Sequence, residues 1–168
     1  DALRYYTVID ADGDRLTWEC SPIDRAARIA WNNNAAAAEH KDDWLISPPL
    51  RLQAGKVYKF TYGARKLYDA ETLTVCLGRN PRVDAMTTVL VPTMQVTGDK
   101  KEEKTLDLTV EADGIYFIGF HATSPRTSGS LYISPFTVAE GVISGAPAAV
   151  TAMEVVPAAD RSHAATIT

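Results

Sequence analysis

The chain has 168 residues, of which 46% are hydrophobic and 23% are charged. This composition is globular, and the length can bury one sizeable core, so we expect one domain with a fragment of another. Acidic residues outnumber basic residues by 21 to 17, which gives a net charge of -4. The basic residues are scattered along the chain, and this pattern argues against nucleic acid as a partner.

No segment resembles a membrane span or an export signal. A spanning helix requires about 20 consecutive apolar residues, and no run approaches that length. The first residues lack the basic start and apolar stretch of a signal peptide. Because the chain begins with Asp1, we expect it to be processed or to belong to a longer protein.

The two cysteines, Cys20 and Cys76, are too few for a disulfide framework and do not decide the compartment. A single bridge between them is one interpretation. The other is a pair of free thiols, and it is favoured because Cys76 lies inside the strand-like segment 72–77, where a small buried thiol is common.

Short β-like runs separated by turn signals recur along the chain, a pattern typical of a sandwich or jelly roll. We expect strands, in chain order, at residues 5–9, 27–31, 57–62, 72–77, 88–91, 105–110, 114–122 and 130–138. Trp44 and residues 45–52 are expected to form a core strand, which Pro48 and Pro49 would confine to an edge or a bulge. Residues 35–38 are expected to form one short helical turn.

Aromatic residues mark the faces of the expected strands. Residues 57–62 alternate between aromatic and polar side chains, so one face of that strand is packed and the other is wet. Trp18, Trp31 and Trp44 each share strand parity with an apolar neighbour. We therefore expect all three in the core, although an amphipathic ring can also stack on a sugar.

Three carboxylates, Asp10, Asp12 and Asp14, lie at alternate positions around a glycine. Carboxylates with this spacing can converge on a hard cation if the backbone turns sharply, and calcium is the natural candidate. The segment is not an EF-hand, because Arg15 and Ser21 stand where that loop needs glycine and a bidentate Glu. The alternative is a solvated acidic turn held by its own side-chain hydrogen bonds.

No catalytic motif stands out in the sequence. The histidines form no spaced pair suited to zinc, and Cys76 and His121 lack the surroundings of a nucleophile and its base. Glu102 and Glu103 lie in a run of charges typical of a solvated loop, not of a glycosidase pair. We therefore expect a protein that is not an enzyme.

A better candidate for binding is the segment 64–69, which we interpret as a surface loop. It combines a cation, Arg65, with an exposed aromatic ring, Tyr68. We predict these two residues as ligand-binding. The alternative is an ordinary polar connection between strands.

Several motifs together carry a specific family resemblance. They are VIDADGD at 8–14 followed by Trp18, DWLISPPLRL at 43–52, AGKVY at 54–58, ETLTV at 71–75 with Gly78, residues 86–88, GIYFIGFH at 114–121 and LYI at 131–133. In this order they resemble the cleaved-adhesin or choice-of-anchor J domains of Bacteroidetes surface proteins, over nearly all of residues 3–140. The resemblance implies an all-β jelly-roll β-sandwich, found in secreted adhesins and proteases and in some cases binding calcium.

The resemblance has two departures that concern the expected calcium site. Arg15 stands where the family often has glycine after the acidic turn, and Ser134 and Pro135 replace an acidic pair that is typical of its last strand. If that acidic pair helps to hold the metal, the site formed by residues 10–14 is expected to be weak or empty.

The composition shifts after Val142 to small residues, Pro and Gly. We expect a jelly-roll domain at 1–142, a linker at 143–149 and a short C-terminal β appendage at 150–168. The appendage resembles the first strands of a fibronectin type III domain. It is too short to bury a core, so it is expected to pack on the main domain, pair with another chain or begin a following domain.

The function implied by these features is that of an adhesion or carbohydrate-binding accessory module. Such a module is expected in an extracellular or cell-surface multidomain bacterial protein, with a host or matrix glycan or protein as its partner and calcium as a structural cofactor. The alternative functions are a structural spacer that presents neighbouring domains and an accessory domain of a secreted protease.

Overall fold

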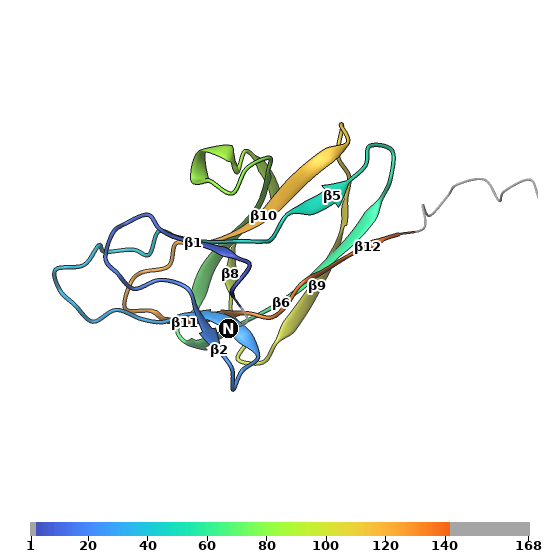
Figure 1. Cartoon of the computed structure of the whole chain (residues 1–168). Coiled ribbons are helices and arrows are strands. Elements are labelled where there is room, and N and C mark those ends of the chain that lie inside the picture. The colour runs from blue at the N-terminus through green and yellow to red at the C-terminus, as the bar shows by residue number, and fades with distance from the viewer. Residues whose placement is uncertain (1–2, 142–168) are drawn as a thin grey trace, which may run out of the picture.

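The computed structural model describes residues 3–141, so the expected linker at 143–149 and the appendage at 150–168 lie outside the described residues. The described chain forms two six-stranded antiparallel sheets that pack face to face (Figure 1). Sheet A has the order β1-β4-β10-β7-β8, and β5 also pairs with β10. Its strands are β1 (Thr7–Asp10), β4 (Asp43–Ile46), β5 (Leu50–Leu52), β7 (Glu71–Gly78), β8 (Thr88–Val96) and β10 (Gly114–Ala122).

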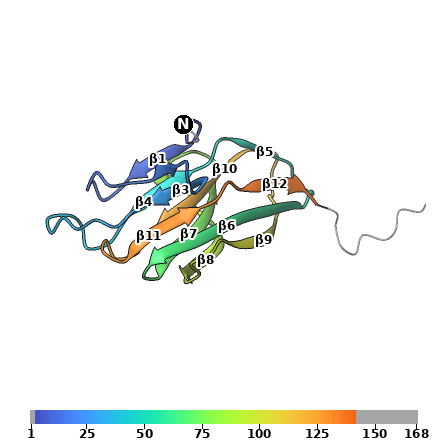
Figure 2. The ribbon, with the colours of Figure 1, turned by 90° about the horizontal axis from the view of Figure 1, so that it is seen from below.

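Sheet B has the order β12-β6-β11-β3-β2, with β9 on the other edge of β6 (Figure 2). Its strands are β2 (Glu19–Ser21), β3 (Ala26–Ile29), β6 (Tyr58–Tyr68), β9 (Glu102–Leu108), β11 (Gly129–Ile133) and β12 (Thr137–Glu140). Strands that are neighbours in a sheet are mostly far apart in the sequence, because the chain crosses repeatedly between the two sheets. The predicted all-β jelly-roll sandwich is confirmed.

The core lies between the two sheets and consists of the side chains at alternate positions of each strand, which point inward. The aromatic positions of β6, which include Phe60 and Tyr62, are buried there as predicted. Phe60 packs on Phe120 of β10 and on Phe136, with ring centroids 6.3 and 5.8 Å apart. Burial of such rings supplies much of the stabilising area of a sandwich of this size.

A second, smaller apolar cluster covers the outer face of sheet A. Trp44, Ile46, Cys76 and Met86 are buried together there. Met86 follows the 3-10 helix η1 (Val83–Ala85), and the connection between β7 and β8 thereby folds back over the sheet. The chain thus buries apolar side chains on both faces of sheet A.

Several predicted elements differ from the structure. The predicted strand over 45–52 is two strands, β4 and β5, because Pro48 and Pro49 interrupt the ladder, although both strands still pair with β10. The segment 64–69 is not a loop, because β6 continues to Tyr68 and pairs there with β11. Residues 35–38 form a turn without helix, and residues 130–138 are divided between β11 and β12.

The predicted burial of the tryptophans is confirmed for Trp18 and Trp44 but is wrong for Trp31. Trp18 is 3% exposed and Trp44 is 6% exposed, whereas Trp31 is 37% exposed. The parity argument fails for Trp31 because β3 ends at Ile29, two residues earlier than predicted. Trp31 therefore lies beyond the end of the sheet, where strand parity no longer sets its direction.

The two cysteines carry free thiols. Cys20 lies in β2 of sheet B, and Cys76 lies in β7 on the outer face of sheet A. Burial raises the pKa of the Cys76 thiol, as expected for a buried structural cysteine. Among residues 3–141, no helix is long and apolar enough to span a bilayer.

Candidate functional site

The loops that carry the candidate residues lie at one end of the sandwich, on the left of Figures 1 and 2. They are the segments 11–18, 30–42 and 123–128, and the turn that joins β6 to β7 meets the same end. Strand pairing explains this arrangement. Asp10 is paired with Asp43, Asp43 with Ala122, and Tyr68 with Gly129, so the ends of sheet A and of sheet B meet here.

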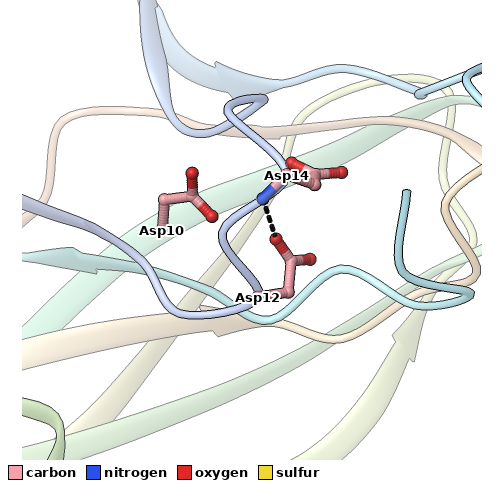
Figure 3. A group of neighbouring side chains, drawn as sticks. All are labelled: Asp10, Asp12 and Asp14. Atoms are coloured by element: carbon pink, nitrogen blue, oxygen red, sulfur yellow. Dashed lines mark hydrogen bonds between the residues drawn. The ribbon is translucent and has the colours of Figure 1, made fainter. Parts of the chain in front are cut away.

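The predicted acidic residues come together in a tight turn directly after β1 (Figure 3). One carboxylate oxygen from each of Asp10, Asp12 and Asp14 lies within 4.8 Å of the others. Backbone N–H groups of the turn orient them: Gly13 and Arg15 donate to the two oxygens of Asp10 at 2.7 and 2.9 Å. The dashed line in Figure 3 is the bond from the Asp14 N–H to Asp12, 3.0 Å long. The turn is thus a preformed carboxylate cluster.

The environment affects the charges of this cluster in opposite directions. Burial raises the pKa of Asp10, but the hydrogen bonds from Arg15, Asp12, Gly13 and Asp14 outweigh it, and the net pKa is lowered. The pKa of Asp12 is raised, first by burial and then by the carboxylates of Asp10 and Asp14, against the hydrogen bond from the Asp14 N–H. Charges of one sign are therefore held together in the turn.

A fourth carboxylate, Asp43, faces this cluster from the neighbouring strand. Asp43 is the cross-strand partner of Asp10, is 1% exposed, and neither of its carboxylate oxygens has a hydrogen-bond partner of ordinary geometry. Burial raises its pKa to about 7; the hydrogen bond from the Thr17 hydroxyl opposes this shift, and the charges of Asp12, Asp10 and Asp14 add to it. A buried carboxylate with so few hydrogen-bond donors is costly.

The buried charge of Asp43 bears on whether a metal ion fits the site. A divalent cation at Asp10, Asp12 and Asp14 would neutralise the repulsion among these carboxylates and offset the negative charge that they exert on the buried Asp43. The donor set consists of oxygens alone on an irregular turn, which matches the preference of calcium. A polar pocket of about 290 Å³, lined by the turn and by residues 34 and 36–38, opens beside the cluster.

The two departures from the family pattern have different structural consequences. Arg15 has φ of 69°, so it adopts the left-handed backbone that glycine favours, and its N–H still caps Asp10. Ser134 donates its backbone N–H to the Gly63 carbonyl of sheet B at 2.9 Å. The additional carboxylate beside the turn comes from Asp43 of β4, which the sequence analysis did not select.

A second feature of this end is an exposed aromatic pair, Trp31 and Tyr68. Their rings are in edge-to-face contact, with centroids 5.4 Å apart and planes at 81°. The side chains are 37% and 63% exposed; Trp31 lies in the loop after β3, and Tyr68 is the last residue of β6. Contacts of this geometry stabilise an aromatic pair by about 0.5 to 1.5 kcal/mol, so the two rings form one apolar surface in contact with solvent.

The backbone at Tyr68 is unusual and explains how its ring is presented. Tyr68 has φ of 77°, a conformation that bulky residues rarely adopt and that tends to occur at functional sites. Gly129 lies opposite in β11, and a Cβ atom there would lie 2.1 Å from the Leu67 carbonyl oxygen. The turn from β6 to β7 thus requires glycine on the partner strand and directs the Tyr68 ring outward.

The other predicted ligand-binding residue, Arg65, lies on the outer face of sheet B. Its guanidinium stacks over the Tyr132 ring at 3.7 Å and forms an ion pair with Asp24 at 2.6 Å. Arg65 and Tyr68 are therefore in different surroundings, since Arg65 belongs to a row of paired charges and Tyr68 pairs with Trp31. The position of Trp31 at the end of the expected strand 27–31 is the sequence feature that could have indicated an exposed ring.

The residues considered for nucleophilic chemistry are engaged in packing. The His121 ring stacks on Trp44 with centroids 4.0 Å apart, and its Nε2 lies 2.6 Å from the Asp42 carboxylate. Burial raises the pKa of Cys76, which disfavours the thiolate that a nucleophile needs. His121 of β10 and Cys76 of β7 thus pack within two neighbouring strands of sheet A.

The completed fold is similar to several solved structures. The K1 cleaved adhesin domain of Lys-gingipain from Porphyromonas gingivalis W83 matches with a TM-score of 0.65 and 15% identity, over 83% of this chain and 92% of that domain. The fold is that of cleaved adhesin and carbohydrate-binding domains. A CBM4 structure matches with a TM-score of 0.60 and 17% identity, over 81% of this chain and 86% of that one.

A third similar structure is the N-terminal cellulose-binding domain of β-1,4-glucanase C from Cellulomonas fimi. It matches with a TM-score of 0.55 and 18% identity, over 82% of this chain and 89% of that domain. No protein-family model and no curated protein matches the chain. Identities of this size show a shared fold, and function has to be argued from the site.

Proposed function

We propose that this chain is a non-catalytic carbohydrate-binding or adhesion module of a secreted or cell-surface multidomain protein. The observation that carries the proposal is the exposed edge-to-face pair of Trp31 and Tyr68. The similar solved structures include a cellulose-binding domain, and binding through rings at the end of a rigid sandwich is consistent with that fold. A host or matrix glycan is the partner that we propose.

The chemistry of the pair favours a sugar ligand over a purely apolar one. A pyranose ring presents an apolar C–H face and a polar rim, and rigid aromatic rings offer contact area with little loss of conformational entropy. The guanidinium of Arg126 lies beside the loop that carries Trp31, since its Nη1 donates to the Asn32 carbonyl at 2.9 Å.

We expect Trp31→Ala and Tyr68→Ala each to weaken glycan binding at least about ten-fold, which corresponds to about 1.4 kcal/mol. The physical reason is the loss of one of the two stacking surfaces. The measurement is a glycan array followed by isothermal titration with the best array ligand.

Tyr5→Ala is the matched control, because Tyr5 is 70% exposed and lies outside the pair. It should bind as the wild type does. Wild-type silence on both glycan and matrix-protein arrays would contradict the proposal and favour a spacer that presents neighbouring domains.

We also propose that calcium is a structural cofactor held by Asp10, Asp12 and Asp14, with the buried carboxylate of Asp43 beside them. Calcium at about 100 times its Kd should stabilise the fold by roughly 2.7 kcal/mol, because it binds the folded state alone. Calorimetry with calcium and with chelator measures this effect. Magnesium should have less effect, since it demands stricter octahedral geometry.

Two variants separate the roles of the carboxylates. Asp12→Asn should weaken the calcium response by removing a charge while keeping an oxygen. Asp43→Asn should weaken it too, yet it should raise the stability of the chelated protein, because it removes an unpaired buried charge. Identical wild-type unfolding curves with calcium and with chelator would exclude the metal and leave a solvated acidic turn.

A further inference from the structure

One buried amide, Asn32, connects the acidic turn with the loop that carries Trp31. Its Nδ2 donates to Asp14 Oδ2 at 2.7 Å, and its Oδ1 accepts the N–H of Asn34 at 2.9 Å. Asn32 is 9% exposed and follows Trp31 directly in the chain. Both ends of its side-chain amide are therefore bonded, and its orientation is determined.

The backbone of Asn32 is held by the turn of residues 123–128. Its N–H donates to the Arg126 carbonyl at 2.7 Å, and its own carbonyl accepts from Arg126 Nη1 at 2.9 Å. The same turn also holds the backbone next to Tyr68, since the N–H of Asp69, the residue after Tyr68, donates to the Ser128 carbonyl at 3.0 Å. The residues that follow the two aromatic residues are thus both hydrogen-bonded to the turn of residues 123–128.

We infer that Asn32 is a positioning residue that couples the acidic turn to the aromatic pair, so that calcium at the turn alters the setting of Trp31 beside Tyr68. This inference rests on the proposed function and names a regulation of that site. The coupling acts through the hydrogen bond from Asn32 to Asp14, because Asp14 belongs to the carboxylate cluster and Asn32 adjoins Trp31.

The physical basis is that each oxygen of the Asp14 carboxylate already accepts one hydrogen bond. Its Oδ1 accepts the Leu16 N–H at 2.8 Å, and its Oδ2 accepts from Asn32. Each oxygen keeps a second lone-pair direction for a cation. A cation that fixes the Asp14 carboxylate also fixes the acceptor of Asn32, whereas without the cation that acceptor is oriented by the Leu16 N–H and by Asn32 itself.

The chain contains a second tryptophan that reports on the acidic cluster independently of Asn32. The indole N–H of Trp18 donates to the carbonyl of Asp43 at 3.2 Å. Indole N–H signals in a two-dimensional nitrogen–proton NMR spectrum can be assigned by replacing each of the 3 tryptophans with Phe. The Trp18 signal then reports calcium at the cluster, and the Trp31 signal reports its transmission.

The experiment titrates calcium into the chelated protein and follows both signals. In the wild type both should shift, and in Asn32→Ala the Trp18 signal should still shift while the Trp31 response is lost. Asn34→Ala is the matched control, since Asn34 lies in the same segment and its side chain caps Ala36 instead of Asp14. It should behave as the wild type.

The outcomes are distinguishable. A wild-type Trp18 shift without a Trp31 shift would overturn the coupling and leave the metal site standing, as would an unchanged Trp31 response in Asn32→Ala. No shift of either wild-type signal would overturn the calcium site and the coupling together, while glycan binding is tested separately. If Asn32→Ala fails to fold, Asn32→Gln keeps the amide but displaces it by one methylene, and it should reduce the Trp31 response in the same way.

Discussion

Replacing Lys41 with Met is expected to destabilise the protein by about 3 to 5 kcal/mol, the cost of breaking a buried ion pair from one side. Lys41 is 3% exposed and Glu71 is 0% exposed. The Lys41 ammonium donates to Glu71 at 2.9 Å and to the Gly129 carbonyl at 2.8 Å. Burial lowers the pKa of Lys41, and Glu71 opposes that shift. Without Lys41, Glu71 keeps a buried charge with only the Ser128 hydroxyl as partner.

Urea denaturation of three variants tests this expectation. Lys59→Met is the matched surface control, because Lys59 and Asp107 are both about half exposed and such pairs contribute between about 0 and 1 kcal/mol. Adding Glu71→Gln to Lys41→Met should recover part of the loss, since the buried charge is then removed. A loss below about 1 kcal/mol for Lys41→Met would show that the buried pair contributes no more to stability than a surface pair.

Replacing Trp44 with Ala is expected to cost about 3 to 5 kcal/mol. Trp44 stacks on His121 and packs with Ile46, Cys76 and Met86 over the outer face of sheet A. Truncation leaves a cavity under the connection that carries Met86, and that connection cannot collapse without disturbing β7. The melting temperature and the urea midpoint measure the effect.

Trp44→Phe is the informative control, because the indole N–H of Trp44 is buried without a hydrogen-bond partner. Phe keeps a ring against His121 and removes the unpaired donor, so it should cost less than half of the Ala substitution. A melting temperature unchanged by Trp44→Ala would refute the assignment of Trp44 to a core strand.

The local pattern of the sequence was sufficient for the fold class. Alternation in β6 and the glycines between apolar runs reflect the pleat and the turns, which depend on neighbouring residues. The predicted strand at residues 114–122 agrees with β10 in both bounds. The acidic turn was also predictable, because its hydrogen bonds run between residues two to five apart.

Strand ends were less predictable, since they depend on pairing with distant segments. The segment 64–68 has the polar composition of a loop, yet it is a strand because β11 pairs with it from Ala64 to Tyr68. Trp31 shares parity with Ile29, yet it is exposed because β3 ends first. Propensity within a short window contains no information on where a partner strand stops.

The sequence by itself therefore determined an all-β sandwich, its turns and the three clustered carboxylates, all of which follow from interactions within a few residues. Only the tertiary structure decided which distant groups join them. Asp43 meets the acidic turn through a cross-strand pair, Trp31 meets Tyr68 across the end of sheet B, and Asn32 links the two features. These contacts depend on the register of strands far apart in the chain, which is set by packing of the whole core.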